Sequence, residues 1–441
     1  MSTEVELPVE ERILQLLQHL GIQQAHFAAS TPSDWQGLVT AHPEVISSLT
    51  LVTPRAVDPS VLGTIAPRLL VFNGDRGNSA EGLQRSMVSL PDATVVALHD
   101  YLRSNAADVI ADRGDSIGPT LIDFLGRTND GPEARTIPLS EGEGEMAGIS
   151  YRIRGSGPPL LLLPIEYAPS QWEPLLPALT QHYSTITLGG AWLGVVAILE
   201  ARAQGDYMAA VQRLVDETRL QPGERVLDVG CGSGSLNRWL AHRTGETNPI
   251  MGVDISTHLV REAVALARSE GLEGVIEFRA ASAEALPFPD SSFDVSMSFT
   301  VAQFVDVDRM LGEMMRVTKP GGRIGILATA GDRPKIINLP LRTELKTKAE
   351  APRGAGPNPR GCADASLYRR FYQLGLTQVK MFPQLATSAD RVRLQFLQGE
   401  ILAVLTPEEA EEWRTAVTEG EAEGTFFITE PYHCAVGTKP G

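Results

Sequence analysis

A glycine-rich loop follows a short apolar run in the middle of the chain, with glycine at three alternate positions: Gly230, Gly232 and Gly234. Glycine adopts backbone angles closed to other residues and lets a ligand approach the main chain closely. The apolar run Arg225–Val229 predicts a buried strand before the loop, and Ile250–Asp254 predicts the next strand. A strand, glycine turn, helix and strand in this order predict a nucleotide-type ligand site at the carboxyl end of the first strand.

Three kinds of ligand site share such a loop: a dinucleotide site, a phosphate loop and a methyl-donor site. The dinucleotide pattern requires a further glycine for close helix packing, but Ser235 occupies that position. The phosphate loop requires Gly-Lys-Ser/Thr, which does not follow. The carboxylate of Asp228 at the strand end would repel a pyrophosphate, whereas it would attract a ligand that carries a sulfonium and an ammonium.

The stretch from Asp228 to Gly234 resembles motif I of the class I S-adenosylmethionine-dependent methyltransferases. Residues 205–330 resemble small-molecule methyltransferases of the ubiquinone/menaquinone-biosynthesis type. This resemblance implies a Rossmann-like domain over residues 201–441, S-adenosylmethionine as the cofactor and a small-molecule methyl acceptor. The donor-binding residues that it implies are Asp228, Gly230, Cys231, Gly232, Gly234, Asp254, Ile255, Ser282, Ala283 and Phe299.

Further segments fall where that family places them. Asp254 ends the second strand, where an acidic side chain can accept hydrogen bonds from both ribose hydroxyls. Ser282 stands where the family often has an acid for the adenine amino group, and a hydroxyl accepts that bond more weakly. Ser292–Ser298 predicts the fourth strand, and Glu313–Gly322 predicts the turn into a fifth strand at Arg323–Leu327.

Methyl transfer is an in-line displacement that requires mainly positioning and desolvation, so a catalytic base is optional. If the acceptor is a hydroxyl or an acidic carbon, we expect a base near the end of the fourth strand or in the C-terminal segment. The candidate catalytic residues are Gln303, which cannot titrate, His433, and Tyr207, which could close over the donor. Each has an alternative interpretation: Gln303 as part of the pocket wall, His433 as a packed strand residue and Tyr207 as a core aromatic.

Residues 331–400 follow the predicted fifth strand and are expected to hold a substrate cover. Their first part, residues 331–365, is rich in proline and glycine and predicts loops. A lid at this place would exclude water and set specificity. A surface loop without this role is the alternative.

The first 200 residues resemble an α/β-hydrolase whose two halves stand in swapped order, at residues 5–130 and 138–195. We expect one circularly permuted, hydrolase-like sheet, which requires Gln24–Ala28 and Leu160–Leu163 to lie in the same sheet. The predicted fold class is therefore α/β with two doubly wound sheets, one in each of the domains 1–200 and 201–441.

Ser30, Asp75 and His99 occur in the chain order of a hydrolase triad. The predicted turn at Ser30 lacks its flanking glycines, and His99 is expected just after the last strand. At the oxyanion position Pro164 has no N–H and Glu166 would oppose negative charge. A non-catalytic domain is predicted; a bifunctional enzyme that uses Ser30 and a donor-binding scaffold without turnover stay open.

Composition narrows the class of protein. A chain of 441 residues with 43% hydrophobic and 21% charged residues is expected to form at least two globular domains. A net charge of −16 disfavours nucleic-acid partners, and the absence of an apolar run near 20 residues predicts no membrane insertion. The acidic start and three unpaired cysteines predict a cytoplasmic protein with free thiols and no metal site, with homodimer contacts as an option.

Overall fold

The computed structural model describes residues 7–54, 56–102, 108–128, 139–354, 356–388 and 391–441. The chain forms two compact units, which are described separately below: Met1–Ile198 with Gln398–Val404, and Leu199–Leu397 with Leu405–Gly441. The break after Ile198 falls two residues before the boundary predicted from the sequence. No feature of the sequence predicted that the short segment Gln398–Val404 belongs to the first unit.

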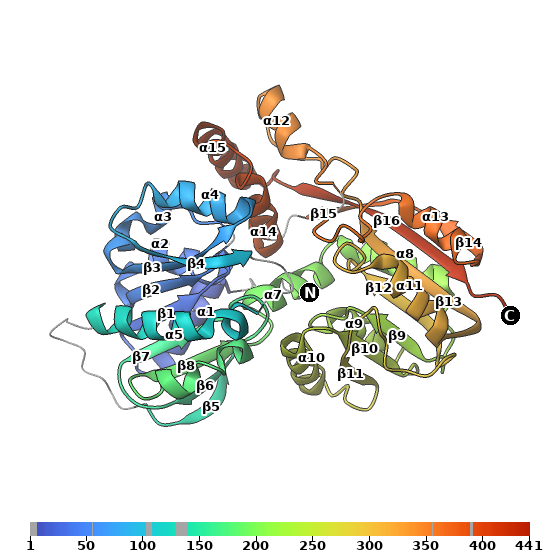
Figure 1. Cartoon of the computed structure of the whole chain (residues 1–441), viewed down its shortest axis with the longest axis horizontal. Helices are drawn as coiled ribbons and strands as arrows, with labels where there is room; N and C mark the ends of the chain where they lie inside the picture. The colour runs from blue at the N-terminus through green and yellow to red at the C-terminus, as the bar shows by residue number, and fades with distance from the viewer. Residues whose placement is uncertain (1–6, 55, 103–107, 129–138, 355, 389–390) are drawn as a thin grey trace. The chain divides into compact units, whose positions relative to one another are not determined.

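The first unit is built on an eight-stranded sheet of order β4-β3-β2-β1-β7-β8-β6-β5 (Figure 1). Its strands are β1 Ala25–Ala29, β2 Ile46–Val52, β3 Leu69–Arg76, β4 Thr94–Leu102, β5 Gly142–Met146, β6 Ile149–Arg154, β7 Pro159–Leu162 and β8 Ser184–Gly189. Its helices are α1 Val9–His19, α2 Gln36–Ala41, α3 Pro59–Leu62, α4 Asn78–Met87, α5 Val109–Thr128 and α6 Leu176–Leu179, while α7 Gly194–Gln204 contains the break between the units.

Both halves of the first 200 residues belong to this one sheet. β1 pairs with β7 in parallel, with His26 opposite Leu160, so the expected juxtaposition of the two halves is confirmed. Alternate residues of β1 serve the two faces: Phe27 packs in one hydrophobic cluster and Ala28 in the other. Helices and loops cover both faces of this sheet, which explains why its central strands β1 and β7 are buried along almost their whole length.

The second unit holds a sheet of order β11-β10-β9-β12-β13-β16-β14, with β15 paired to β16. Its strands are β9 Val226–Val229, β10 Ile250–Asp254, β11 Ile276–Ala280, β12 Phe293–Phe299, β13 Thr318–Thr329, β14 Thr377–Met381, β15 Gln384–Ser388 and β16 Ile428–Thr438. Its helices are α8 Tyr207–Thr218, α9 Ser235–Arg243, α10 Thr257–Ser269, α11 Val307–Val317, α12 Thr343–Glu350, α13 Ser366–Gln373 and α15 Pro407–Glu423, while α14 Arg391–Leu402 contains the second break between the units.

The predicted strand–glycine turn–helix–strand unit is present as β9, α9 and β10, with β9 between β10 and β12. Strands β9 to β13 run parallel, so their carboxyl ends meet at one edge of the sheet. β16 runs antiparallel to β13, with His433 opposite Ala328. The carboxyl edge of the parallel strands is where ligands bind in open sheets of this kind.

Two expectations about local structure need correction. The fifth strand was predicted to begin at Arg323, but β13 begins at Thr318 because a bulge before Arg323 keeps the earlier residues extended beside β12. Gly321 takes a positive φ of +77° in this bulge. The segment 331–365 was predicted to form loops, but it contains the helix Thr343–Glu350. The prolines of this segment flank the helix and do not interrupt it, so its high proline content did not exclude a helix.

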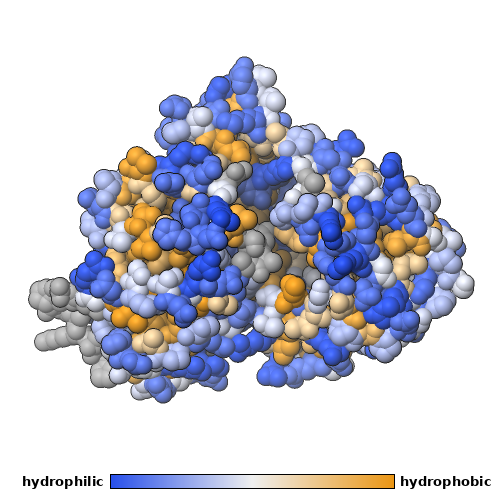
Figure 2. All heavy atoms as spheres, viewed as in Figure 1, coloured by the Kyte–Doolittle hydropathy of each residue, from blue (hydrophilic) through white to orange (hydrophobic). Residues whose placement is uncertain are grey.

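Among the described residues, no helix is long and apolar enough to cross a membrane. On the face drawn in Figure 2, hydrophilic residues predominate and hydrophobic ones gather in small separate groups. The three cysteines, Cys231, Cys362 and Cys434, are free thiols and buried, as the sequence predicted. They act as small core residues, not as crosslinks.

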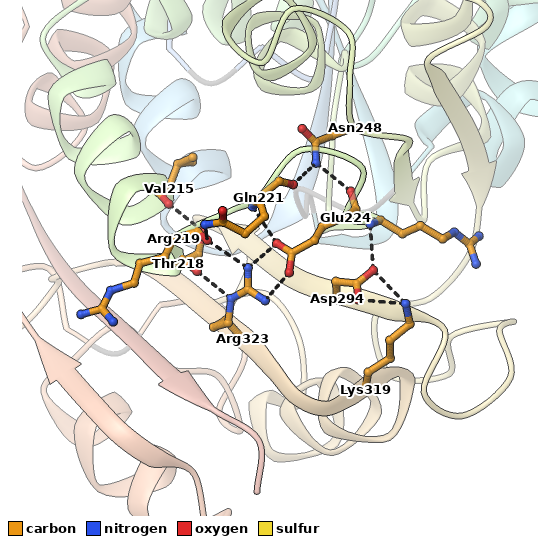
Figure 3. A network of polar contacts seen from close by, with 10 residues as sticks. Val215, Thr218, Arg219, Gln221, Glu224, Asn248, Asp294, Lys319 and Arg323 are labelled. Carbon is orange, nitrogen blue, oxygen red and sulfur yellow. Dashed lines mark hydrogen bonds and ion pairs between the residues drawn. The ribbon is translucent and has the colours of Figure 1, made fainter. Parts of the chain in front are cut away.

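A polar network ties together the amino-terminal edge of the second sheet (Figure 3). The guanidinium of Arg323 donates through Nε to the carbonyl of Thr218 at 2.6 Å and through Nη1 to Glu224 Oε1 at 2.9 Å. The amide of Asn248 donates to the backbone carbonyl of Glu224 at 2.9 Å. Lys319 Nζ lies 2.8 Å from Asp294 Oδ1 in the same network. The end of the sheet opposite the ligand edge is thereby fixed.

Replacing Glu224 by glutamine is expected to lower the free energy of unfolding by about 1–3 kcal/mol at pH 7, the usual loss for a hydrogen bond between charged groups. Burial opposes ionisation of Glu224, but hydrogen bonds from Arg323 and from the Gln221 N–H outweigh it and lower its pKa. Its contribution is therefore present above about pH 4.3, the unfolded value, and is lost as the pH falls through the lower folded value.

The measurement is denaturant unfolding of wild type and Glu224→Gln at pH 7 and pH 3.5, with the gap between them expected to shrink at the lower pH. The control is Glu273→Gln, because Glu273 forms an exposed ion pair with Arg268 and its loss should leave the stability unchanged. An equal gap at both pH values would contradict the assigned role of Glu224.

Candidate functional site

The glycine loop after β9 needs glycine for both conformation and space. Gly230, Gly232 and Gly234 have φ angles of +83°, +56° and +73°. The N–H groups of Gly230 and Cys231 both donate to the carbonyl of Val253 on β10, at 2.7 and 2.9 Å. A Cβ added to Gly230 would lie 2.1 Å from Cγ2 of Val301, so no side chain fits there. Glycine is therefore required here by the backbone conformation and by the close packing of Val301.

A network of ion pairs connects the glycine loop to the earlier helix α7. Glu200 on α7 accepts from Ser233 Oγ at 2.8 Å and pairs with Arg238 on α9 at 2.6 Å. Arg238 also donates to the carbonyl of Ser233 at 2.9 Å and pairs with Glu270 at 2.7 Å. The guanidinium is almost fully buried, so it depends on these partners. Sequence reasoning missed Glu200 because nothing in its local pattern marks a loop contact.

Asp228 is a buried carboxylate at the end of β9, with 4% of the residue exposed. Its Oδ1 has no hydrogen-bond partner among the described residues. Burial, reinforced by the negative charge of Asp254, raises the pKa of Asp228 to about 7. A buried acceptor without a partner is costly, and a cationic ligand placed beside it would remove that cost.

Asp254 braces the loop from the end of β10. Its Oδ2 accepts from the N–H of Gly232 and its Oδ1 from the N–H of Ser256, both at 2.9 Å. Burial raises the pKa of Asp254, although these N–H groups act in the opposite direction. The neighbouring Ile255 is an apolar side chain of which 69% is exposed. An exposed apolar side chain next to a carboxylate fits the nucleoside end of a ligand.

The other predicted donor residues occupy the same end of the sheet. Ser282 forms a bridge with Ala285, and its Oγ accepts from the N–H of Glu284 at 3.2 Å. Ala283 and Phe299 are buried, with 9% and 8% exposed. Cys231 is buried in the loop, and burial raises its thiol pKa, so it stays a neutral wall residue.

Beyond the loop, two tyrosines and an arginine form a buried group. Tyr207 begins α8, and its ring lies 5.3 Å from that of Tyr432 on β16. The guanidinium of Arg202 lies 4.0 Å above the Tyr207 ring and donates to Thr300 Oγ1 at 3.2 Å. Both tyrosine hydroxyls and Nε of Arg202 are buried without a partner in the part of the chain that is described. Sequence reasoning missed Arg202 and Tyr432, because no motif surrounds either residue.

Gln303 lies in the loop after β12, as predicted. Its Nε2 donates to Thr329 Oγ1 at the end of β13, at 3.3 Å, while its Oε1 is buried without a partner among the described residues. The predicted cover segment contacts this loop: the N–H of Asn358 donates to the carbonyl of Gln303 at 3.3 Å, and the N–H of Cys362 to that of Ala302 at 2.8 Å.

His433 lies within β16 and is 3% exposed. Its Nδ1 is 2.9 Å from the hydroxyl of Tyr368, and its Nε2 is 2.7 Å from Asp332 Oδ1. Because neighbouring strand residues point to opposite faces, His433 and Tyr432 face different sides of the sheet. The structure therefore separates the two candidates Tyr207, which packs on Tyr432, and His433.

The residues of the suggested hydrolase triad in the first unit are poorly placed for catalysis. His99 was expected after the last strand, but it lies within β4, and its side chain is 91% exposed. Its Nδ1 is 3.7 Å from Asp75 Oδ2, beyond hydrogen-bond distance, and Asp75 accepts instead from the N–H of Asp100 at 2.8 Å. Ser30 is buried, and no hydrogen bond to His99 is present among the described residues.

The expected oxyanion position in the first unit is also occupied. The N–H groups of Glu166 and Tyr167 donate to the side-chain carbonyl of Gln171, at 3.0 and 2.6 Å. Gln171 is fully buried, so these donors are fixed in this arrangement. N–H groups that already have a buried partner do not form an oxyanion hole.

Comparison with known proteins places a methyltransferase domain in the second unit. Residues 227–326 match the family model described as a methyltransferase domain. The chain is 36% identical over 138 residues to the methyltransferase GfsG of Streptomyces halstedii, which covers 31% of this chain and 48% of that protein. It is 37% identical over 114 residues to the ubiquinone/menaquinone biosynthesis C-methyltransferase UbiE of Escherichia coli O1:K1 / APEC, covering 26% of this chain and 45% of that protein.

The chain thus spans about half the length of the curated relatives it matches. A solved structure of a putative methyltransferase from Bacillus halodurans C-125 is 16% identical, covering 53% of this chain and all of that one, with a TM-score of 0.36. That TM-score is too low to add to the assignment. The sequence matches support an S-adenosylmethionine-dependent methyltransferase domain. The matched residues 227–326 begin within β9 and end within β13.

Replacing Gly230 by alanine is expected to destabilise the second unit and to weaken donor binding. The change forces an alanine into a positive φ, which costs about 1–2 kcal/mol, and drives its Cβ into Val301, which adds about 1–3 kcal/mol. Gly223 provides the matched control, because it has the same φ of +83° and open space around the added Cβ. Gly223→Ala should show the first cost alone and bind the donor normally, as measured by denaturant unfolding and calorimetry. Equal losses in the two variants would show that the contact with Val301 is unimportant.

Proposed function

We propose that this protein transfers the methyl group of S-adenosylmethionine to a small-molecule acceptor. The observation that carries the proposal is the buried carboxylate of Asp228, whose Oδ1 has no hydrogen-bond partner among the described residues, behind a loop of three positive-φ glycines. A pyrophosphate would be repelled by this carboxylate, whereas a ligand with a sulfonium and an ammonium would supply its missing partner. The match of residues 227–326 to a methyltransferase domain supports the same ligand.

The unpartnered polar atoms fit the amino-acid end of this donor. Asp228 Oδ1 is an acceptor suited to the α-ammonium, and Nε of Arg202 is a donor suited to the α-carboxylate. Tyr207 lies near both groups, because the charges of Arg202 and Asp228 both affect the pKa of its hydroxyl. A zwitterionic group would therefore satisfy opposite charges at neighbouring points of one site.

The nucleoside end of the donor is assigned to the next two strand ends. We assign Asp254 to the ribose hydroxyls, because a carboxylate can accept from both. Ile255 and Ala283 provide apolar surface for the adenine, and Ser282 an acceptor for its amino group. Gly230, Cys231, Gly232, Gly234 and Phe299 form the wall between the two ends of the donor.

The donor supplies an electrophilic methyl group on a sulfur that leaves as a neutral thioether. The protein's contribution is then to orient the acceptor in line with that methyl group and to exclude water. Gln303 is suited to hold the acceptor, because its Oε1 is a buried acceptor atom without a partner among the described residues. The segment from Gly354 to Cys362, which bonds to the Gln303 loop, is suited to close over it.

We infer that the first unit is a circularly permuted, hydrolase-like domain without hydrolase activity. If the chain is renumbered from β5, its sheet order becomes 1-2-4-3-5-6-7-8, so that the first and last strands lie at the two edges of the sheet. The exposed His99 and the occupied N–H groups of Glu166 and Tyr167 support the loss of catalysis. Labelling by a fluorophosphonate that disappears in Ser30→Ala would instead support a bifunctional enzyme.

Donor affinity is expected to fall as the pH is lowered below 7. The pKa of Asp228 is raised to about 7 by burial and by Asp254, so below that pH its carboxyl is neutral and cannot pair with a cation. The affinity for S-adenosylmethionine should therefore drop by up to about tenfold per pH unit between pH 7 and pH 5.5.

Calorimetry between pH 7 and pH 5.5 measures this affinity, and Asp228→Asn should make it nearly independent of pH. Asp216→Asn, which removes an exposed partner of Arg243, should keep the pH dependence. A wild-type affinity independent of pH would contradict the role of Asp228.

Replacing Asp254 by alanine is expected to weaken donor binding by about 1–3 kcal/mol, the usual loss for a charge-assisted hydrogen bond. Two effects add, because Asp254 would bind the ribose and also holds the N–H of Gly232. Calorimetry with S-adenosylhomocysteine, the demethylated product, measures the change. Unchanged affinity in Asp254→Ala would argue against the proposed nucleoside end.

A protein that binds the donor as a scaffold would show the same affinities without turnover. Incubation with labelled S-adenosylmethionine and candidate acceptors distinguishes the two, since only an enzyme yields S-adenosylhomocysteine in an acceptor-dependent way. We propose a monomer or homodimer as the assembly, which sedimentation would resolve.

A further inference from the structure

Three side chains from separate segments of the second unit meet in one hydrogen-bonded line. Asp332 follows β13, Tyr368 lies on α13, and His433 lies on β16 between them. The hydroxyl of Tyr368 is 2.9 Å from His433 Nδ1, and Asp332 Oδ1 is 2.7 Å from His433 Nε2. The imidazole is buried, whereas Tyr368 is partly exposed and the carboxylate of Asp332 is 29% exposed.

The chemistry of the partners fixes the direction of these hydrogen bonds. An ionised carboxylate can only accept, so Nε2 of His433 must carry a hydrogen toward Asp332. In the neutral ring Nδ1 is then an acceptor, and the hydroxyl of Tyr368 must donate to it. The oxygen of Tyr368 can accept from two donors, so it has room for one more beside the backbone of Cys434. Burial raises the pKa of Tyr368 to about 12, which keeps it a neutral hydroxyl that can pass a proton on.

Further charged groups surround this line. Arg333 Nε lies 3.5 Å from Asp332 Oδ2. Hydrogen bonds with Ser366 are the main cause that lowers the pKa of Asp364, and this carboxylate is also close enough to interact with His433. A positive charge that arrives on the ring of His433 would face two carboxylates.

The line ends beside the region where the acceptor is expected. His433 pairs with Ala328, the residue before Thr329, and the Thr329 hydroxyl accepts from Gln303. Gln303 is two residues after Val301, which packs against the glycine loop. Oε1 of Gln303 is a buried acceptor without a partner among the described residues, and it would be satisfied by a ligand that carries a hydrogen-bond donor.

We propose that the methyl acceptor is a hydroxyl compound and that Tyr368, His433 and Asp332 carry its proton away. This inference rests on the proposed function. The acceptor hydroxyl gives its proton to the oxygen of Tyr368, and the proton of Tyr368 passes to Nδ1 of His433. The acceptor oxygen forms a bond to the donor methyl carbon as the carbon–sulfur bond breaks, and that electron pair stays on sulfur. Asp332 faces the resulting imidazolium, and the proton then leaves to solvent.

Tyr368 is the catalytic residue in this scheme, because it contacts the acceptor, whereas His433 and Asp332 act through it. A residue that only stabilises the fold would affect all acceptors equally. A residue that removes a proton matters only for acceptors that still hold one. Acceptors of one shape and different acidity therefore separate the two roles.

The experiment compares wild type with Tyr368→Phe, His433→Asn and Asp332→Asn on two probes, phenol and pentafluorophenol. Phenol keeps its proton at pH 7, having a pKa near 10 like tyrosine, while pentafluorophenol is largely ionised. Tyr368→Phe should lower kcat/KM for phenol by about 10²- to 10⁴-fold and leave that for pentafluorophenol nearly unchanged. The matched control is Tyr372→Phe on the same helix, an exposed tyrosine whose loss should affect neither probe.

A second measurement needs no acceptor. Nitrogen-15 NMR of the free protein should show His433 protonated at Nε2 and unprotonated at Nδ1, with the Nδ1 signal shifted in Tyr368→Phe. The opposite tautomer overturns the relay even if a variant fails to fold. Equal losses on both probes, or no methylation of either probe by a wild type that binds S-adenosylhomocysteine, also overturn it. Failure to bind S-adenosylhomocysteine would instead overturn the proposed function.

Discussion

The buried carboxylate of Asp228 is the constraint on which the second unit depends. An acidic group at the end of a central strand is costly to ionise, and Asp254 nearby raises that cost. A side-chain contact with Asn237 offsets this cost only in part, because the nearby N–H groups of the loop bond to Val253 and Asp254 instead. The fold thus holds an acceptor ready for a cation, and its rigidity comes from elsewhere, at the glycine loop and at the network around Arg323.

The parts of the site that are local in sequence could be predicted, because their physical causes are local. Positive φ angles follow from glycine spacing, and the position of Asp254 at a strand end follows from the apolar run before it. Arg202, Tyr432, Asp332 and Tyr368 could not be predicted in the same way, since each meets its partners across at least 60 residues or another element. What brings them together is β16 lying beside β13, a pairing that no short segment encodes.

In the first unit, the pairing of the two halves in one sheet could be predicted from the sequence, but the geometry around Ser30, Asp75 and His99 could be predicted only in part. The absence of flanking glycines near Ser30 and of an N–H at Pro164 pointed to a damaged site. The sequence could not indicate that Gln171 would take the N–H groups of Glu166 and Tyr167, or that β4 would continue through His99. These outcomes depend on side-chain packing and on strand pairing with β3, which are not local properties.

The alternation of residues along β16 divides the polar groups of the second unit into two sets. Tyr432 turns to the face of α8, where Tyr207 and Arg202 lie, whereas His433 turns to the face of α13. Unpartnered polar atoms occur on the first face, and a fully paired histidine occurs on the second. An unpartnered group suits a ligand that binds with its own charges, while a paired histidine suits transfer of a proton along existing hydrogen bonds. In the proposed mechanism, two consecutive residues of one strand would thereby serve donor recognition and proton removal without competing for the same space.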